Sequence, residues 1–389
     1  MNIAIICGYP IPHGMAATTR INAYSKGLVE EGANVDVWSF VPTGNKYNEN
    51  IPDSVTVNNI HYQYSFRRKR FANKIGHAFE IFFSILLLFI KVCARRKKYD
   101  SIIVSTDNPF ILAAMSIIKT KSCALLFIFD EYPIPIRKKL KEKIPLWKYF
   151  SYKSALKNYS GYISMTKTLL EYYQTICHHP GVVISNIIDT TRFQDNSYRE
   201  ATLPSTFKIC YVGNMELTKD NVDNIIVALS KTKNKDKCHL CLFGVPSQKD
   251  KLFLQKTIEQ LNFQNKVSFD FTPSEYIPKT LQEADILVSS QPDTKRAEGG
   301  FPTKLGEYLA SGKPTLLTNV GEISKNFVHK KHLFLAEPDN PTDYADKLDY
   351  IIEHYENALE IAQIGKQYIA ENFSHRKAGK EIINFINNI

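Results

Sequence analysis

The fold is decided by the stretch Glu298–Pro314, EGGFPTKLGEYLASGKP. Two glycines follow its glutamate, and Pro302 then stands where a helix can begin, because its fixed φ and missing amide hydrogen suit the first helical position. The apolar periodicity predicts a helix over residues 302–311, which Gly312 ends before a short apolar strand. A glycine-rich entry of this kind leaves backbone amides that can bind a phosphate.

Two charged side chains of this helix suggest what it binds. Lys304 lies in the first turn, where the helix dipole repels a cation, so an anion at the helix start explains its presence. Glu307 follows one turn later on the same side and can accept hydrogen bonds from a pair of ribose hydroxyls. An ordinary capped helix with a solvated lysine and glutamate is the alternative interpretation of this segment alone.

The composition is that of a globular protein with room for two domains: 389 residues, 44% hydrophobic and 23% charged. The seven cysteines are scattered, which favours thiols in a reducing compartment and hence a cytoplasmic enzyme without a signal peptide. Cys238 and Cys241 have CxxC spacing but fall in an apparent strand. Its alternation turns them to opposite faces, so we do not expect a metal site there.

The net charge of +10 comes from the first half of the chain, where basic residues form runs. Two runs, Arg67–Arg70 and Arg95–Lys98, bracket an apolar helix, and a third spans Arg137–Lys143. The longest apolar run, Phe79–Ile90, is expected to be too short to span a bilayer. Basic clusters beside apolar and aromatic residues suit an anionic leaflet and predict a protein peripheral at the inner face of the membrane. Solvated faces, with the apolar helix buried against a sheet, are the alternative, and no motif indicates nucleic acid.

Short β-branched runs alternate with helical patterns along both halves, which predicts an α/β fold of two doubly wound, Rossmann-like domains. We expect strands over 2–7, 34–40, 55–64, 101–105, 124–129, 162–164, 207–212, 239–243, 266–271, 286–289, 314–317 and 332–335. We expect helices over 16–31, 75–97, 110–119, 147–157, 166–177, 221–231, 248–261, 273–283, 302–311, 342–353 and 376–387.

These elements predict the domain boundaries. The first domain covers residues 1–185 and the second 207–372, with a linker over 186–206. A C-terminal helix within 373–389 is expected to pack back on the first domain. Ligands of doubly wound sheets bind at the carboxyl ends of the strands, which here would face a central cleft.

Several residues at the predicted strand ends of the first domain are candidates for acceptor binding and catalysis. The loop after the first strand can offer backbone donors and a cation to a hydroxyl-rich group, through Gly14, Met15, Ala16 and Arg20. Three carboxylates that follow later strands can orient an acceptor hydroxyl or take its proton: Asp107, Asp130 and Glu131. For each of these residues a role in a turn or a helix cap is the alternative.

In the second domain, the first strand ends at Gly213, which allows a ligand to approach the backbone closely. Lys219 lies in the loop that follows, and together with Lys304 it can clamp a diphosphate with two point charges. Asp220 and Asp223 are expected to be an N-cap and a helix-start residue, which are structural roles.

Four segments together resemble the nucleotide-sugar-dependent glycosyltransferases of family 4, which have the GT-B fold. They are GYPIPHGMAATTR after the first strand, VISNIIDTTRF before the second domain, YVGNMELTKDNVD, and EGGFPTKLGEYLASGKP. The resemblance covers essentially the whole chain, and the last two segments carry most of its specificity.

The resemblance implies a donor site in the second domain, with the diphosphate near Gly213 and Lys219 and the ribose at Glu307. It further implies that the donor contacts Asn214, Phe271, Thr272, Gly299, Gly300, Phe301, Pro302, Thr303 and Lys304. The family usually has an acidic residue eight positions before the ribose glutamate, where this chain has Gly299. Glu298, one position earlier, is the candidate for that role. The arginine that often follows the strand glycine is here Asn214.

These observations predict a retaining hexosyltransferase that uses a UDP- or GDP-sugar without a metal or other cofactor. Its acceptor is expected to be a lipid-linked saccharide in surface polysaccharide, O-antigen or capsule biosynthesis. A soluble sugar or protein acceptor, a GT-B sugar-nucleotide epimerase and a non-catalytic assembly partner are the alternatives.

Overall fold

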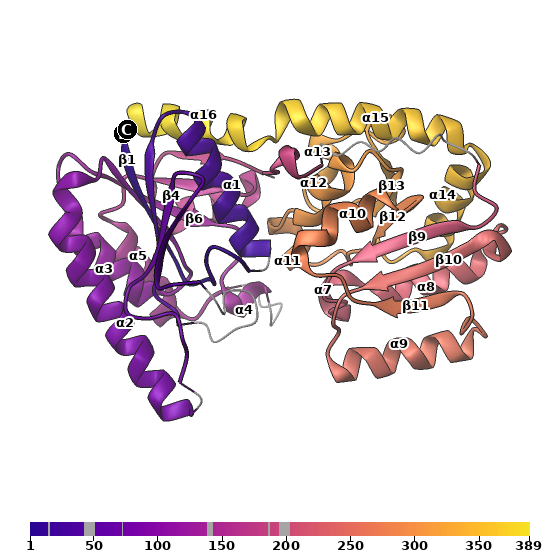
Figure 1. Ribbon diagram of the computed structural model, residues 1–389, viewed down its shortest axis with the longest axis horizontal. Coiled ribbons are helices and arrows are strands. Elements are labelled where there is room, and N and C mark those ends of the chain that lie inside the picture. The colour runs from indigo at the N-terminus through magenta and orange to yellow at the C-terminus, as the bar shows by residue number, and fades with distance from the viewer. Residues whose placement is uncertain (15, 43–50, 72, 138–142, 186, 194–202) are drawn as a thin grey trace. The chain divides into compact units, whose positions relative to one another are not determined.

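The computed structural model describes residues 1–14, 16–42, 51–71, 73–137, 143–185, 187–193 and 203–389. These residues form two compact units (Figure 1). The first combines Met1–Ile187 with Ser374–Ile389, and the second is Ile188–Phe373. Met15, most of the expected linker and Lys138–Glu142 of the third basic run lie outside the described residues.

The first unit is built on a sheet of strand order β3-β4-β2-β1-β5-β6-β7-β8, in which β3 alone runs antiparallel to its neighbour. The central strands are apolar throughout, as strands covered by helices on both faces must be. The strands are β1 (Asn2–Cys7), β2 (Asn34–Ser39), β3 (Ser54–Val57), β4 (Ile60–Tyr64), β5 (Ser101–Ser105), β6 (Ala124–Phe129), β7 (Gly161–Ser164) and β8 (Gly181–Val183). The helices are α1 (Ala16–Glu30), α2 (Lys74–Arg95), α3 (Pro109–Ile118), α4 (Ile134–Arg137), α5 (Leu146–Leu156), α6 (Lys167–Ile176) and α16 (His375–Asn387).

Two expectations for this unit are wrong. The single strand expected over residues 55–64 is a hairpin of β3 and β4, joined by Asn58 and Asn59, both with positive φ. Asparagine tolerates that conformation and forms tight hairpin turns, so the pair was the missed signal. No strand was expected at Val182-Val183, but these residues belong to β8 and pair with β7.

The second unit has a parallel six-stranded sheet of order β11-β10-β9-β12-β13-β14. Its strands are β9 (Phe207–Val212), β10 (Cys238–Phe243), β11 (Val267–Asp270), β12 (Ile286–Ser289), β13 (Thr315–Thr318) and β14 (Phe334–Ala336). Its helices are α7 (Leu217–Asp220), α8 (Val222–Lys231), α9 (Gln248–Gln260), α10 (Ile277–Gln282), α11 (Lys295–Gly299), α12 (Thr303–Ala310), α13 (Ile323–Asn326), α14 (Pro341–Glu353) and α15 (Tyr355–Asn372). The sequence analysis missed α15, which follows α14 almost without a break.

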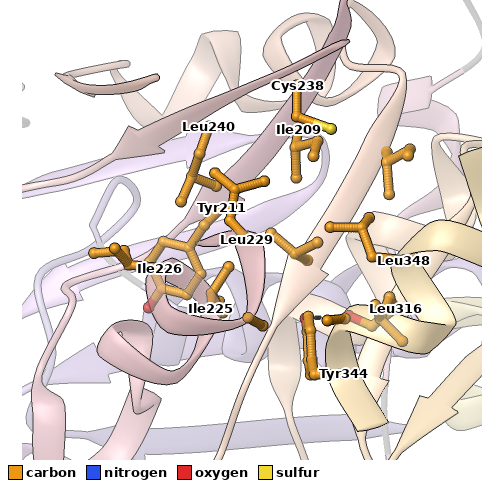
Figure 2. Close-up of a cluster of buried hydrophobic side chains, with 14 of the residues drawn as sticks. Ile209, Tyr211, Ile225, Ile226, Leu229, Cys238, Leu240, Leu316, Tyr344 and Leu348 are labelled. Atoms are coloured by element: carbon orange, nitrogen blue, oxygen red, sulfur yellow. Dashed lines mark hydrogen bonds between the residues drawn. The ribbon is translucent and has the colours of Figure 1, made fainter. Parts of the chain in front are cut away.

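The core of the second unit lies between its sheet and helices α8 and α14. Figure 2 shows side chains from β9, β10 and α8 meeting those of β13 and α14. The Tyr344 hydroxyl donates to the carbonyls of Leu316, at 3.1 Å, and of Ser289, at 3.2 Å. A buried tyrosine therefore satisfies its polar atom on the backbone of β12 and β13.

The C-terminal helix α16 completes the first unit by packing on α1. A Cβ added to Gly27 of α1 would lie 1.9 Å from the His375 carbonyl oxygen, and one added to Gly379 would lie 2.2 Å from the carbonyl carbon of Gly27. The two backbones therefore touch where glycine is the only residue that fits. Ion pairs from Glu30 to His375, at 3.0 Å, and to Arg376, at 2.8 Å, lie beside this contact.

Helix α2 is longer than the apolar run within it. An 18-residue window within Ile75–Lys98 has a mean hydropathy of 1.9, so this stretch is long and apolar enough to cross a membrane by length and composition alone. The expectation from the sequence concerned residues 79–90 alone, whereas the longer helix α2 passes this test of length and composition. Core helices of soluble proteins pass the same test, so the finding does not by itself make α2 a membrane span.

Candidate functional site

The predicted donor site lies where the strand order of the second sheet reverses. Strands β9 and β12 are neighbours there, although two strands and four α-helices separate them in sequence. Helix α12 is tied to this point by Tyr308, whose hydroxyl accepts from the Val212 amide at 2.9 Å and donates to the Val288 carbonyl at 3.4 Å. Crevices of this kind hold the ligands of doubly wound sheets.

Lys304, in the first turn of α12, reaches the end of β9. Its ammonium lies 3.0 Å from the Asp220 carboxylate and donates to the Tyr211 hydroxyl at 2.9 Å. The Lys304 side chain is 16% exposed and that of Asp220 is 4% exposed. Burial lowers the pKa of Lys304, although the neighbouring Asp220 charge opposes this shift. Lys304, for which the sequence suggested a bound anion, therefore has a carboxylate partner within its own unit.

Asp220 is not the N-cap that the sequence suggested. It ends the short helix α7, and Asn221, with φ of 45°, is the cap residue of α8. Burial raises the pKa of Asp220, but the charges of Lys304 and Lys219 outweigh burial and hold the pKa below its usual value. Lys219 also lowers the pKa of Lys304, so both lysines act on the same carboxylate. The expected lysine pair is thus close together, with an aspartate between its members.

Gly213 lies directly against this cluster. A Cβ there would be 2.5 Å from the Tyr211 hydroxyl and 2.8 Å from the Lys304 ammonium. Gly244, after β10, has φ of 146°, and a Cβ on it would be 1.8 Å from the Gly213 carbonyl oxygen. Glycine at 213 therefore leaves space beside the ammonium, and glycine at 244 is needed because a side chain there would overlap the backbone of Gly213.

Glu307 is held by Arg192, which was not among the residues expected from the sequence. Arg192 donates to Glu307 Oε1 at 2.6 Å and to the Ser274 carbonyl at 3.2 Å. Both side chains of this ion pair are partly exposed. Arg192 stands in the segment VISNIIDTTRF, where an arginine just before the second domain was the available signal. The contact fixes the carboxylate predicted to bind ribose.

The glycine-rich entry to α12 is a short helix, α11, followed by a turn. Glu298 forms an ion pair with Lys295 at 2.6 Å and is about half exposed. Gly299 ends α11, and Gly300 leads to Phe301, which is buried. Pro302 precedes α12 and Thr303 begins it on the exposed side. The side chain of Pro302 cannot cap the helix, so the first amides of α12 are not capped by it.

The remaining donor candidates lie in other loops of the second unit. Asn214 is exposed directly after Gly213. Phe271 is exposed after β11, and the Thr272 hydroxyl contacts that of Thr280 at 3.0 Å.

In the first unit, Arg20 has a structural environment. It is buried, forms a 3.0 Å ion pair with Asp130, and donates to the Ile184 carbonyl at 2.9 Å. Its guanidinium thus links α1 to the ends of β6 and β8, which does not favour the expected direct contact with an acceptor. Burial raises the pKa of Asp130 despite the Arg20 charge.

The other first-unit candidates gather at the ends of β5 and β6. Arg137 forms ion pairs with Glu131 and, at 3.5 Å, with Asp107, which brings these two carboxylates to the same guanidinium. Gly14 is buried against Thr18, where a Cβ would lie 2.2 Å from the hydroxyl oxygen, and Ala16 is exposed at the start of α1.

The chain was compared with known protein families, curated proteins and solved structures. Residues 194–368 match the family described as glycosyl transferases group 1. An uncharacterized glycosyltransferase of Methanocaldococcus jannaschii is 24% identical over 177 residues, which cover 45% of this chain. That match spans less than half, 43%, of the relative's own length.

Solved structures resemble the whole chain. Sucrose-phosphate synthase from Thermosynechococcus elongatus has a TM-score of 0.75 at 14% identity, covering 100% of this chain and 98% of that one. Anabaena HepE, in complex with UDP and glucose, has a TM-score of 0.70 at 15% identity and covers 100% of both chains. TarM of S. aureus, in a complex that contains UDP, has a TM-score of 0.70 at 14% identity and covers 99% of both.

At such identities the structural likeness establishes the fold, which is GT-B, as predicted. Residues 194–368, most of the second unit, match the glycosyl transferases group 1 family, and the whole chain has the GT-B fold of the solved structures.

Proposed function

We propose that this protein transfers a sugar from a nucleoside-diphosphate sugar to a hydroxyl acceptor with retention of anomeric configuration. The observation that carries the proposal is the convergence of Gly213, Lys304 and Glu307 at the β9–β12 switch point. The features found there suit such a donor: open backbone and ammonium groups can bind a diphosphate, and a fixed carboxylate can bind a ribose. HepE, which has the same fold, is solved with UDP-glucose.

The diphosphate is proposed to lie over Gly213, because a side chain at this position would stand between it and the Lys304 ammonium. Asp220 holds that ammonium charged in a buried place, and Lys219 supplies a second positive charge nearby. As the bond from the anomeric carbon to the phosphate oxygen breaks, its electron pair passes to the diphosphate. Ammonium groups fixed beside the growing charge stabilise it without reorganising.

The acceptor oxygen forms the new bond to the anomeric carbon on the same face from which the diphosphate leaves. Its proton passes to the departing phosphate oxygen, so that no protein base is required for the atoms to balance. The Asp107, Asp130 and Glu131 group of the first unit is proposed to orient the acceptor hydroxyl. All three carboxylates have an arginine partner, which fixes their positions.

For the acceptor, we propose a lipid-linked saccharide of a surface polysaccharide pathway. The support is the basic and apolar surface of the first unit, which suits a substrate embedded in a membrane. Turnover of the donor measured with and without a polyprenyl-diphosphate sugar tests this choice. Equal turnover with a soluble sugar would replace the lipid acceptor by a soluble one, and interconversion of the free donor would indicate an epimerase.

Donor binding is tested by thermal unfolding of the full chain with a panel of nucleoside diphosphates and their sugars. One base should raise the unfolding temperature, because a ligand at 100 times its dissociation constant stabilises by about 2.7 kcal/mol. Glu307→Gln should weaken that shift, and Glu275→Gln, an exposed position in the nearby loop, serves as the control. If no nucleoside diphosphate shifts unfolding and no sugar is transferred, the protein is a non-catalytic assembly partner and the proposal fails.

A further inference from the structure

Helix α2 presents its apolar face to the outside of the first unit. Its buried stripe consists of Glu80, Ser84, Leu88 and Val92, each at most 1% exposed. The opposite side carries six large apolar residues that are 43–75% exposed, namely Ile75, Phe79, Phe82, Phe83, Leu86 and Ile90. At 3.6 residues per turn these six fall within about 100° of arc. A helix that serves only the core would be oriented the other way.

Polar contacts hold α2 in this orientation. Glu80 accepts from Arg67 Nε at 2.6 Å and from the Phe71 amide at 2.9 Å. Further along the same helix, the Lys91 ammonium donates to the Ser65 carbonyl at 2.9 Å. Rotating α2 to bury its phenylalanines would break the Glu80–Arg67 pair and leave the Glu80 carboxylate without its partner. The ion pair therefore keeps the apolar face of α2 directed outward.

The apolar surface continues onto neighbouring helices. Helix α3 packs against α2, and α5 packs against α3 (Figure 1). Phe110 and Ile117 of α3 are 75% and 70% exposed, and the first residues of α5 include Trp147, at 62%. Exposed apolar patches of this extent on a single chain mark a surface that binds a partner.

The charges around this face identify the partner. Exposed cations stand at both ends of α2, with Lys69 and Arg70 before it and Lys97 and Lys98 after it. The one acidic residue of the helix, Glu80, points inward and is paired. The exposed arc carries no hydrogen-bonding side chain that a protein interface would use. We infer that the α2 face lies in the surface of an anionic lipid bilayer, with its apolar arc among the acyl chains and the flanking cations on the headgroups.

The inference is tested with the full chain and vesicles of phosphatidylcholine, with or without phosphatidylglycerol. We expect the protein to cosediment with the anionic vesicles and to be released by salt. The triple variant Phe79→Ser, Phe82→Ser, Leu86→Ser should lose binding by more than about tenfold. Leu252→Ser with Phe253→Ser changes equally exposed apolar residues of the second unit, and this control should bind like the unchanged protein.

Trp147 gives a second readout, because it is exposed on α5 while Trp38, the other of the two tryptophans, is buried. Its emission should shift to the blue on anionic vesicles. Lys69→Gln with Arg70→Gln should weaken binding by about thirtyfold, since each of the two basic residues near the surface contributes about 1 kcal/mol. Stabilisation by nucleoside diphosphates should persist in every variant, so a failure here is distinct from a failure of the proposed donor site.

Three results would overturn the inference. The first is equal sedimentation of the unchanged protein and the triple variant. The second is self-association in solution that the triple variant abolishes without any vesicle binding, which would assign the face to a second copy of the chain. The third is resistance of the bound protein to alkaline carbonate extraction, which would mean that α2 spans the bilayer.

Discussion

At the scale of single residues, the donor site depends on charge pairs within the second unit. Lys304 is needed by Asp220, and Glu307 is held by Arg192. Each of these residues therefore has a structural role besides the proposed chemical one. A single substitution changes both roles together, so variants must be designed to separate them.

Lys304→Met should lower both stability and turnover. It leaves Asp220 buried without a counterion, which costs about 3 kcal/mol. The double variant with Asp220→Asn removes both charges and should recover most of that stability, while turnover stays low because the diphosphate has lost its ammonium. Measuring the unfolding temperature and kcat of the two variants and of the unchanged protein separates the effect on stability from the effect on turnover. Full activity in the double variant would show that Lys304 serves only the fold.

The Asp220–Lys304 pair also predicts a pH dependence. The folded pKa of Asp220 lies below its usual value, because the two lysines outweigh the effect of burial. The pair therefore stabilises the fold above the unfolded pKa of about 3.9, and this stability is lost as pH falls through the folded pKa. The difference in unfolding temperature between the unchanged protein and Asp220→Asn should be large at pH 7 and should shrink below about pH 4. A difference that is constant with pH would contradict an ionised pair.

Arg192→Ala should weaken donor binding more than it slows the chemical step. The arginine holds Glu307 Oε1 at 2.6 Å and does not itself meet the departing phosphate in the proposed reaction. Losing a charge-assisted hydrogen bond should raise the KM for the donor by about tenfold. Arg192→Lys should recover part of the loss. A fall in kcat with an unchanged KM would show that Arg192 acts on the reaction directly.

At the scale of elements, backbone contacts decide which helices can pack. Helices α1 and α16 meet at Gly27 and Gly379, where a Cβ would overlap the opposite backbone. In the second unit, Tyr308 ties α12 to β9 and β12 through two hydrogen bonds, and so places the helix start at the switch point. Small residues and one buried hydroxyl thus fix elements that lie far apart in sequence.

Gly379→Ala should separate α16 from α1. The added methyl would lie 2.2 Å from the Gly27 carbonyl carbon, and overpacking of this kind costs about 1–3 kcal/mol. Lys380→Ala changes an exposed neighbour on the same helix and should be neutral. Thermal unfolding of both variants makes the comparison. Equal stability would show that the helices can move apart without cost.

At the scale of the molecule, the first unit contains both ends of the described chain. Residues 374–389, which follow the second unit in sequence, belong to the same unit as residues 1–187. The proposed donor groups, from Arg192 to Glu307, all lie in the second unit, and the helices that we propose to contact lipid all lie in the first. Donor binding and membrane attachment should therefore be separable by substitution.

Ending the chain after Phe373 should destabilise the first unit alone. The truncation removes Ala378, Ile382 and Ile386 from its core, which corresponds to about 5 kcal/mol of apolar burial. We expect a transition at lower temperature for the first unit, while a nucleoside diphosphate still raises the transition of the second. Loss of the nucleotide effect would show that the donor site depends on the first unit.

The sequence by itself determined the order of strands and helices, the glycines at the strand ends and the start of α12. Those features follow from local periodicity, φ restrictions and helix-end chemistry, which a single segment carries within itself. The hairpin at Asn58 was missed although its signal was local, and α15 was missed because α14 runs almost directly into it.

Only the tertiary structure decided the partners of the charged groups and the direction of the apolar face of α2. Lys304 and Asp220 are 84 positions apart, and Arg192 and Glu307 are 115 apart. No periodic pattern states which distant side chains will meet, because that depends on how the strands are ordered in the sheet. The outward orientation of the apolar face of α2 likewise depends on the ion pair between Glu80 and Arg67 in the folded unit. The sequence thus indicated which kinds of charged residue are present, and the tertiary structure determined which of them pair.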